Sequence, residues 1–185
     1  RYHNHLYLHY TFVNLLNGTY TFHHLKDRLT LGVQGHFLAF FDGFSRKEWS
    51  EIKSLLEILV AAQGPLSLDL LKAPLCPSPI LPIERLAGYV VQENNALRLN
   101  DDTLKQWLTL KANKSEYRID RRAGHLRLAE FGWDFFCTLI KDTQSQPIDQ
   151  NALLSIKEKL PIELRESLVH HMVESDFYQT LPQDS

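Results

Sequence analysis

One segment of this chain carries every signal that a helix needs. Ser45 is a natural N-cap, Glu48 three residues later completes a capping box, and Phe44 and Trp49 stand at the positions of a hydrophobic staple. Behind this start, apolar residues recur at helical spacing until Gly64-Pro65 ends the pattern. The sequence therefore predicts an amphipathic helix over residues 45–63, whose apolar face must be buried against another layer.

The residues before this helix are expected to form the sheet that it covers. They are rich in β-branched and aromatic residues that alternate with polar ones, and two-residue turn signals interrupt them. The expected turns are Asn17-Gly18, Lys26-Asp27 and Gln34-Gly35, and the expected strands are Leu6–Leu16, Thr19–Leu25, Arg28–Val33 and His36–Phe41. The sequence predicts an α+β fold that begins with a four-stranded antiparallel β-meander covered by the capped helix.

Residues 65–110 change character, since five of the eight prolines lie between Pro65 and Pro82. Short helices are expected over Ser67–Lys72 and Ile83–Ala87. A hairpin of Tyr89–Gln92 and Ala96–Leu99 follows, and then a helix capped by Asp102. The order of helix, short helix, short helix and hairpin resembles a winged helix in architecture, so this segment is expected to be winged-helix-like.

A second hairpin is expected after it, with Tyr117–Ile119 and His125–Leu128 flanking a loop that contains Gly124. The apolar run Phe131–Ile140 predicts a buried helix. A C-terminal helical tail then follows, as the two amphipathic helices Asn151–Leu160 and Ile162–Phe177. The expected domains are the meander with its helix (1–64), the winged-helix-like segment with the basic hairpin (65–140) and the helical tail (147–185).

The charge pattern points to one candidate binding site. The whole chain has a net charge of -2, yet Lys105–Arg127 holds seven basic residues against two acidic ones, a local balance of +5. Arginine forks suit phosphates, so the basic hairpin is predicted to contact nucleic acid or another polyanion. The alternative is a solvated hairpin that pairs with the acidic tail. The candidate nucleic-acid-binding residues are Lys111, Lys114, Arg118, Arg121, Arg122 and Arg127.

Histidines suggest a second candidate, because most of them fall in the expected meander. Residues two apart on a strand, such as His3 and His5, lie about 6.6 Å apart and could share a metal, whereas His5 and His9 lie about 13 Å apart and could not. Such a histidine-rich sheet is similar to metal-binding β-barrels such as cupins, and that resemblance implies a metal-dependent enzyme with His3, His5, His9 and His24 as ligands. The favoured interpretation is exposed sheet histidines, with no metal and no cofactor.

No sequence motif indicates catalysis. The chain lacks a glycine-rich phosphate loop, a Gly-x-Ser-x-Gly elbow and a His-Glu-x-x-His pair, so a non-enzymatic protein is expected. Its two cysteines, Cys76 and Cys137, form no disulfide framework, which favours a reducing, cytoplasmic location. The longest apolar run is far shorter than a bilayer requires, so no membrane association is expected.

Two functional hypotheses follow. The first is a regulatory or adaptor protein that contacts nucleic acid or an acidic protein through the basic hairpin. The alternative is a protein-interaction or assembly subunit with a degenerate winged helix, which could form homo-oligomers through its C-terminal helices. Salt separates the two, because contacts with several phosphates weaken steeply as salt rises, whereas a hydrophobic interface does not weaken in this way.

Overall fold

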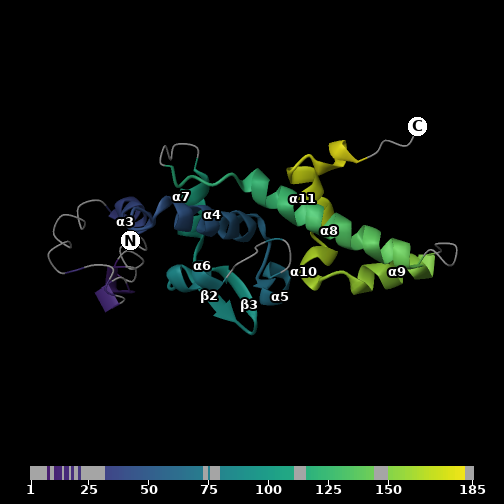
Figure 1. Cartoon of the computed structure of the whole chain (residues 1–185), viewed down its shortest axis with the longest axis horizontal. Coiled ribbons are helices and arrows are strands. Elements are labelled where there is room, and N and C mark those ends of the chain that lie inside the picture. The colour runs from purple at the N-terminus through teal and green to yellow at the C-terminus, as the bar shows by residue number, and fades with distance from the viewer. Residues whose placement is uncertain are drawn as a thin grey trace.

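The computed structural model describes residues 32–72, 75, 80–110, 116–143 and 150–181, together with a few positions between residues 8 and 21. These residues are mostly helical, and they form an elongated molecule with one small sheet (Figure 1). Helix α3 (Gly32–Phe41) lies at one end of the molecule. Helices α8 (Arg121–Thr143) and α9 (Gln150–Lys159) run side by side toward the other end.

The expected β-meander is wrong where the structure describes it. Residues 36–41, expected as its fourth strand, belong to α3, and the expected turn at Gln34-Gly35 lies inside that helix. The described positions from Leu8 to Leu16 are helical as well. The aromatic residues explain the difference, because Phe37, Phe40 and Phe41 also fit one face of a helix, and there all three are buried. Most of the remaining meander lies outside the described residues.

The capped helix is confirmed as α4 (Arg46–Ala61). The Ser45 amide donates to a Glu48 carboxylate oxygen at 2.8 Å, and the Glu48 amide donates to Ser45 Oγ at 3.3 Å, which completes the capping box. The surface that α4 covers differs from the expected one. Its apolar face packs mainly against α8 rather than across a meander, and Trp49 is half-buried against Phe41 and Tyr117.

A three-stranded antiparallel sheet follows α4, in the order β1-β3-β2. Its strands are β1 (Leu66–Ser67), β2 (Val90–Glu93) and β3 (Ala96–Leu99), and the short helices α5 (Leu68–Leu71) and α6 (Ile80–Arg85) lie between β1 and β2 in the chain. The expected hairpin is confirmed, and both of its turn residues, Asn94 and Asn95, have positive φ, as a two-residue turn requires. Strand β1 is not among the elements expected from the sequence.

Helix α7 (Asp102–Thr109) connects the sheet to the aromatic core. Its N-cap is Asp101 rather than Asp102, since the Asp101 carboxylate accepts the amides of Thr103 at 2.6 Å and Leu104 at 3.1 Å. Trp107 of this helix stacks on Phe41 of α3 with ring centroids 5.6 Å apart. The helix therefore joins α3 and the sheet into one core.

The second hairpin is wrong, because residues 121–143 form the single long helix α8. Asp120 begins this helix by accepting the Arg122 amide at 3.0 Å. Gly124 does not serve a turn. A Cβ there would lie 1.9 Å from the Glu57 carbonyl oxygen, so glycine permits a close crossing of α8 over α4. The glycine that suggested a turn in the sequence is required instead for helix packing.

The helical tail is present but divided more finely than expected. Helix α9 matches the first predicted helix, whereas the second is broken into α10 (Ile162–Arg165), α11 (Leu168–Glu174) and a 3₁₀ turn, η2 (Phe177–Thr180). The break allows α11 to turn back and pack on the first half of α8. The division into three domains at residues 64 and 140 stays a prediction.

Candidate functional site

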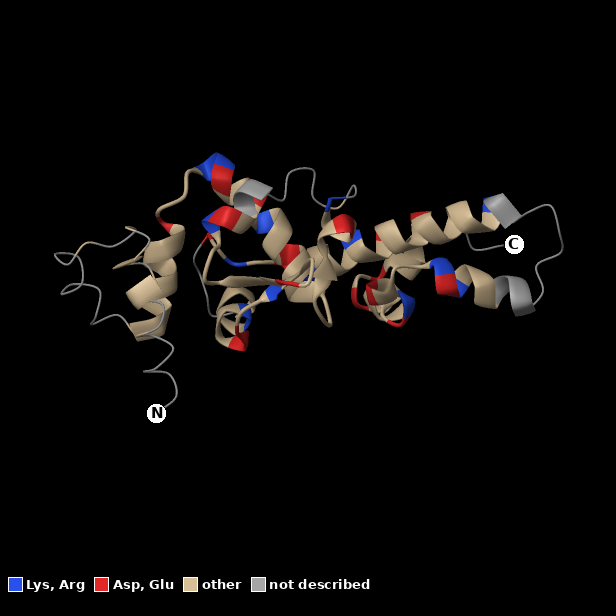
Figure 2. Ribbon diagram, turned by 90° about the horizontal axis from the view of Figure 1, so that it is seen from below, with Lys and Arg blue, Asp and Glu red and all other residues tan. Residues whose placement is uncertain are grey.

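Of the basic candidates that the structure describes, two are held in ion pairs and two are exposed. Of the six candidates, Lys111 and Lys114 lie outside the described residues. Arg122 pairs with Asp176 after α11 at 2.8 Å, and Arg127 pairs with Glu57 of α4 at 3.2 Å. Arg118 and Arg121 are exposed. Figure 2 accordingly shows basic and acidic positions interspersed along the ribbon rather than one basic face.

The ion pairs of these arginines have a structural role. Glu57 is only 5% exposed, and burial raises the pKa of its carboxyl, while Arg127 and Lys53 oppose that shift. Arg127 also donates to the Ser54 carbonyl oxygen at 3.4 Å. The guanidinium therefore compensates a buried charge at the contact between α4 and α8, so its main partners lie within the chain.

The second half of α8 differs from what the sequence predicts. Residues 131–140 are helical as expected, but Gly132 is the only buried residue among them. Apart from Asp134 and Thr138, positions 133–140 are all apolar, and all of those apolar residues are half-buried, so each keeps part of its surface in water. A helix that is apolar on all sides is normally buried on all sides. The helices α4 and α11 cover the first half of α8, whereas α9 runs along one side of this part.

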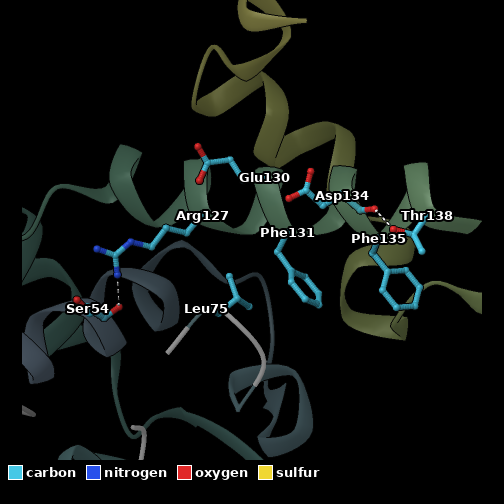
Figure 3. Close-up of a pocket in the computed structure, with 8 residues that line it drawn as sticks. All are labelled: Ser54, Leu75, Arg127, Glu130, Phe131, Asp134, Phe135 and Thr138. Atoms are coloured by element: carbon cyan, nitrogen blue, oxygen red, sulfur yellow. Dashed lines mark hydrogen bonds between the residues drawn. The ribbon is translucent and has the colours of Figure 1, made fainter. Parts of the chain in front are cut away.

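A groove of about 590 Å³ opens on one side of this half of α8. Phe131 and Phe135 point from α8 toward the side where Leu75 lies, whereas Glu130 and Asp134, which also line the groove, point from α8 away from that side (Figure 3). Arg127 closes one end above Ser54. The arrangement combines an apolar floor with an acidic edge. The signal for this site was present in the sequence as the run of aromatic residues, but that run predicted a buried helix of the core.

Two buried histidines join α8 to α11 beside this surface. His125 and His171 are 1% and 2% exposed, and their Nδ1 atoms lie 2.8 Å apart. Arg121 Nε donates to His125 Nε2 at 3.2 Å, and a guanidinium can only donate, so neutral His125 must carry its proton on Nδ1 and donate it to His171. Burial is the main cause that lowers both pKa values to about 4. The pair is neutral at pH 7 and connects the two helices.

The histidines proposed as metal ligands, His3, His5, His9 and His24, lie outside the described residues. His36 is described, and its Nε2 lies 2.8 Å from the hydroxyl of Tyr89 in the core. In the part of the chain that the structure describes, no three side chains of His, Cys, Asp or Glu are placed to hold one metal ion. Helices in the same part are each too short or too polar to cross a bilayer.

The chain was compared with family models, curated proteins and solved structures. No family model matches it, no curated protein matches it, and no solved structure matches it.

Proposed function

We propose that this chain is a non-enzymatic protein-interaction module that assembles with a partner protein through the second half of α8. The observation that carries the proposal is the set of apolar, half-buried residues at positions 133–140, none of which the chain covers completely. Leaving part of the surface of several large aromatic and aliphatic side chains in water is unfavourable by about 25 cal/mol for each Å² of apolar surface. A partner that covers this surface would recover that free energy, and contiguous apolar patches commonly mark such interfaces.

The elements of residues 46–99 fit the same proposal, because they present few cations that could bind a polyanion. Helix α6 carries one arginine, and Arg85 is already 3.3 Å from Glu48 and over the ring of Phe44. The β2–β3 hairpin carries Arg98, which lies 3.7 Å from Glu93. Neither element presents the unpaired cluster of cations on which duplex binding depends. A cytoplasmic location remains part of the proposal.

The surface can be tested by replacing two of its half-buried residues. Phe136→Ser with Ile140→Ser should abolish recovery of a partner from cell extract, and the partner should then bind the purified wild type directly. Val169→Ser with Val173→Ser, on the exposed side of α11, is the matched control and should recover the partner normally. Circular dichroism of each variant checks that the fold survives. Equal recovery by all three proteins would refute an interface on α8.

The nucleic-acid hypothesis is tested with the two exposed arginines. Fluorescence anisotropy at low salt with duplex and single-stranded DNA should detect no binding that depends on Arg118 and Arg121. The opposite result is tight binding that weakens steeply as the salt concentration rises. In that case, Arg118→Glu with Arg121→Glu should reduce the slope of log affinity against log salt concentration by about one unit for each phosphate that is no longer neutralised. That result would favour a nucleic-acid-binding protein instead.

A further inference from the structure

We propose that the groove on α8 binds an amphipathic helix of a partner protein, in which Lys or Arg residues flank the apolar side chains. This inference rests on the proposed function, since the groove is part of the same half of α8. It adds the conformation and the charge of the segment that the groove accepts. Three features of the groove support it: its apolar floor, its length and its acidic rim.

The floor and the length suit a helix. Phe131 and Phe135 stand one turn apart on α8 and are half-buried, and Leu75 lies buried across from them. Apolar side chains four residues apart on a partner helix would match this spacing. The lining residues on α8 run from Arg127 to Thr138, which corresponds to about 17 Å of helix at a rise of about 1.5 Å per residue. That length fits about three helical turns.

The backbone around the groove also favours a helix over an extended strand. Strand addition needs an open sheet edge with free amides and carbonyls. The described lining consists of helix residues from α4 and α8 and of Leu75, and the Ser54 and Asp134 carbonyls accept bonds from Arg127 and Thr138. A helix satisfies its own backbone and requires no such edge.

The rim specifies the charge of the partner. Glu130 and Asp134 are exposed and stand one turn apart on α8, and no described Lys or Arg lies within ion-pair distance of either carboxylate. The nearby Arg127 is already paired with Glu57. The groove therefore presents two negative charges beside its apolar floor, which attract a basic segment and repel the phosphates of nucleic acid.

Three synthetic helical peptides of 14 residues serve as probes. The first has Leu at positions that share one face, with Lys on its flanks; the second has Glu in place of Lys; the third has the composition of the first in a scrambled, non-amphipathic order. In anisotropy titrations of the full chain at low salt, only the first should bind. Phe135→Ala should weaken that binding roughly tenfold, and Glu130→Gln with Asp134→Asn should weaken it roughly 2- to 5-fold for each charge.

Two controls make the outcome decisive. Glu84→Gln with Glu158→Gln removes two exposed acids away from the groove and should leave the affinity unchanged. Raising the salt to about 1 M should abolish the difference between the wild type and the variant of the rim, because the Debye length is then about 3 Å. Equal binding of the basic and acidic peptides would overturn the charge assignment.

The proposed function and this inference fail separately. If the basic peptide does not bind, yet Phe136→Ser with Ile140→Ser still abolishes partner recovery, the interface on α8 stands and the groove proposal is wrong. If sedimentation shows a dimer that Phe135→Ala dissociates, the groove is occupied by a second copy of the chain rather than by a basic partner. Competition of duplex DNA with the peptide at low salt would also overturn the proposal.

Discussion

Gly124 shows how one missing side chain determines how closely two helices can approach. The Cβ of an alanine at this position would lie 1.9 Å from the Glu57 carbonyl oxygen and 2.9 Å from the Ala61 Cβ. Both obstacles belong to α4, and the nearer one is backbone, so the helices would have to separate. We expect Gly124→Ala to lower the free energy of unfolding by about 1–3 kcal/mol, measured by urea denaturation.

Gly132, eight residues further along α8, is the matched control. A Cβ there would meet Leu168 Cδ1, the end of a flexible side chain, at 2.5 Å. Alanine also favours a helix over glycine by about 1 kcal/mol. Gly132→Ala should therefore be nearly neutral. If both variants lose the same stability, close packing of α8 on α4 does not explain Gly124.

The histidine pair predicts how stability depends on pH. The pKa values of His125 and His171 are lowered to about 4, so between pH 6.5 and pH 4 the unfolded chain binds more protons than the folded one. Stability is therefore complete above pH 6.5 and falls as the pH drops toward 4. One pKa unit corresponds to about 1.4 kcal/mol, so the loss over this range should amount to a few kcal/mol. Denaturant midpoints measured from pH 7.5 to pH 4.5 would show it.

The pKa of His125 also depends on the nearby charged groups Arg121, His170 and Glu174. Of these, only Glu174 raises that pKa, because its carboxylate favours the charged imidazole. Replacing both buried histidines, as His125→Phe with His171→Phe, should remove most of this pH dependence while roughly conserving their volume. An unchanged dependence in that double variant would assign the effect to other groups.

At the scale of the element, α4 is specified by its own sequence. Ser45 and Glu48 satisfy each other's backbone amides, and the apolar positions that follow keep one helical phase. Ser45→Ala should lower the free energy of unfolding by about 1 kcal/mol, since one amide of the first turn loses its acceptor. Thermal or urea denaturation measures this loss. A loss near zero would mean that water replaces the cap at no cost.

Helix α8 is the opposite case, because its sequence alone is ambiguous. Its first residues alternate between polar and apolar side chains and contain a glycine, so they fit a hairpin locally. Two contacts from elsewhere in the chain resolve the ambiguity: the crossing with α4 at Gly124 and the packing of α11 on the same half of α8. Both α4 and α11 are far from the start of α8 along the chain, so the local sequence does not reveal these contacts.

At the scale of the whole molecule, Arg127 connects α8 to α4 through a buried charge. Arg127→Met should destabilise the fold by about 1–3 kcal/mol at pH 7, because the Glu57 carboxylate loses its nearest cation and keeps only Lys53 at 3.9 Å. Burial raises the pKa of Glu57, so protonation below that pKa should reduce the loss as the pH falls. Urea denaturation at pH 7 and pH 5 measures both effects.

The double variant Glu57→Gln with Arg127→Met is the control for this pair. It removes both charges, so it should recover most of the stability at pH 7 that Arg127→Met loses. If the two variants are equally unstable at pH 7, the arginine stabilises the molecule through its packing rather than through its charge.

Local signals decided the elements that the sequence predicted well. The capping box of α4, the Ser67 cap of α5 and the turn at Asn94-Asn95 each depend on residues within four positions of one another. Such contacts form in the same way wherever the segment lies in the fold, so they can be read from the chain.

Only the tertiary structure decided which apolar faces are covered. Phe37, Phe40 and Phe41 fit either a strand or a helix until Tyr89 and Trp107 pack against them. The aromatic run after Phe131 predicts burial from its composition alone, yet the chain covers the first half of α8 and leaves the second half and its groove partly open. Composition sets how much apolar surface a segment carries, whereas contacts between residues far apart in the chain determine what covers it.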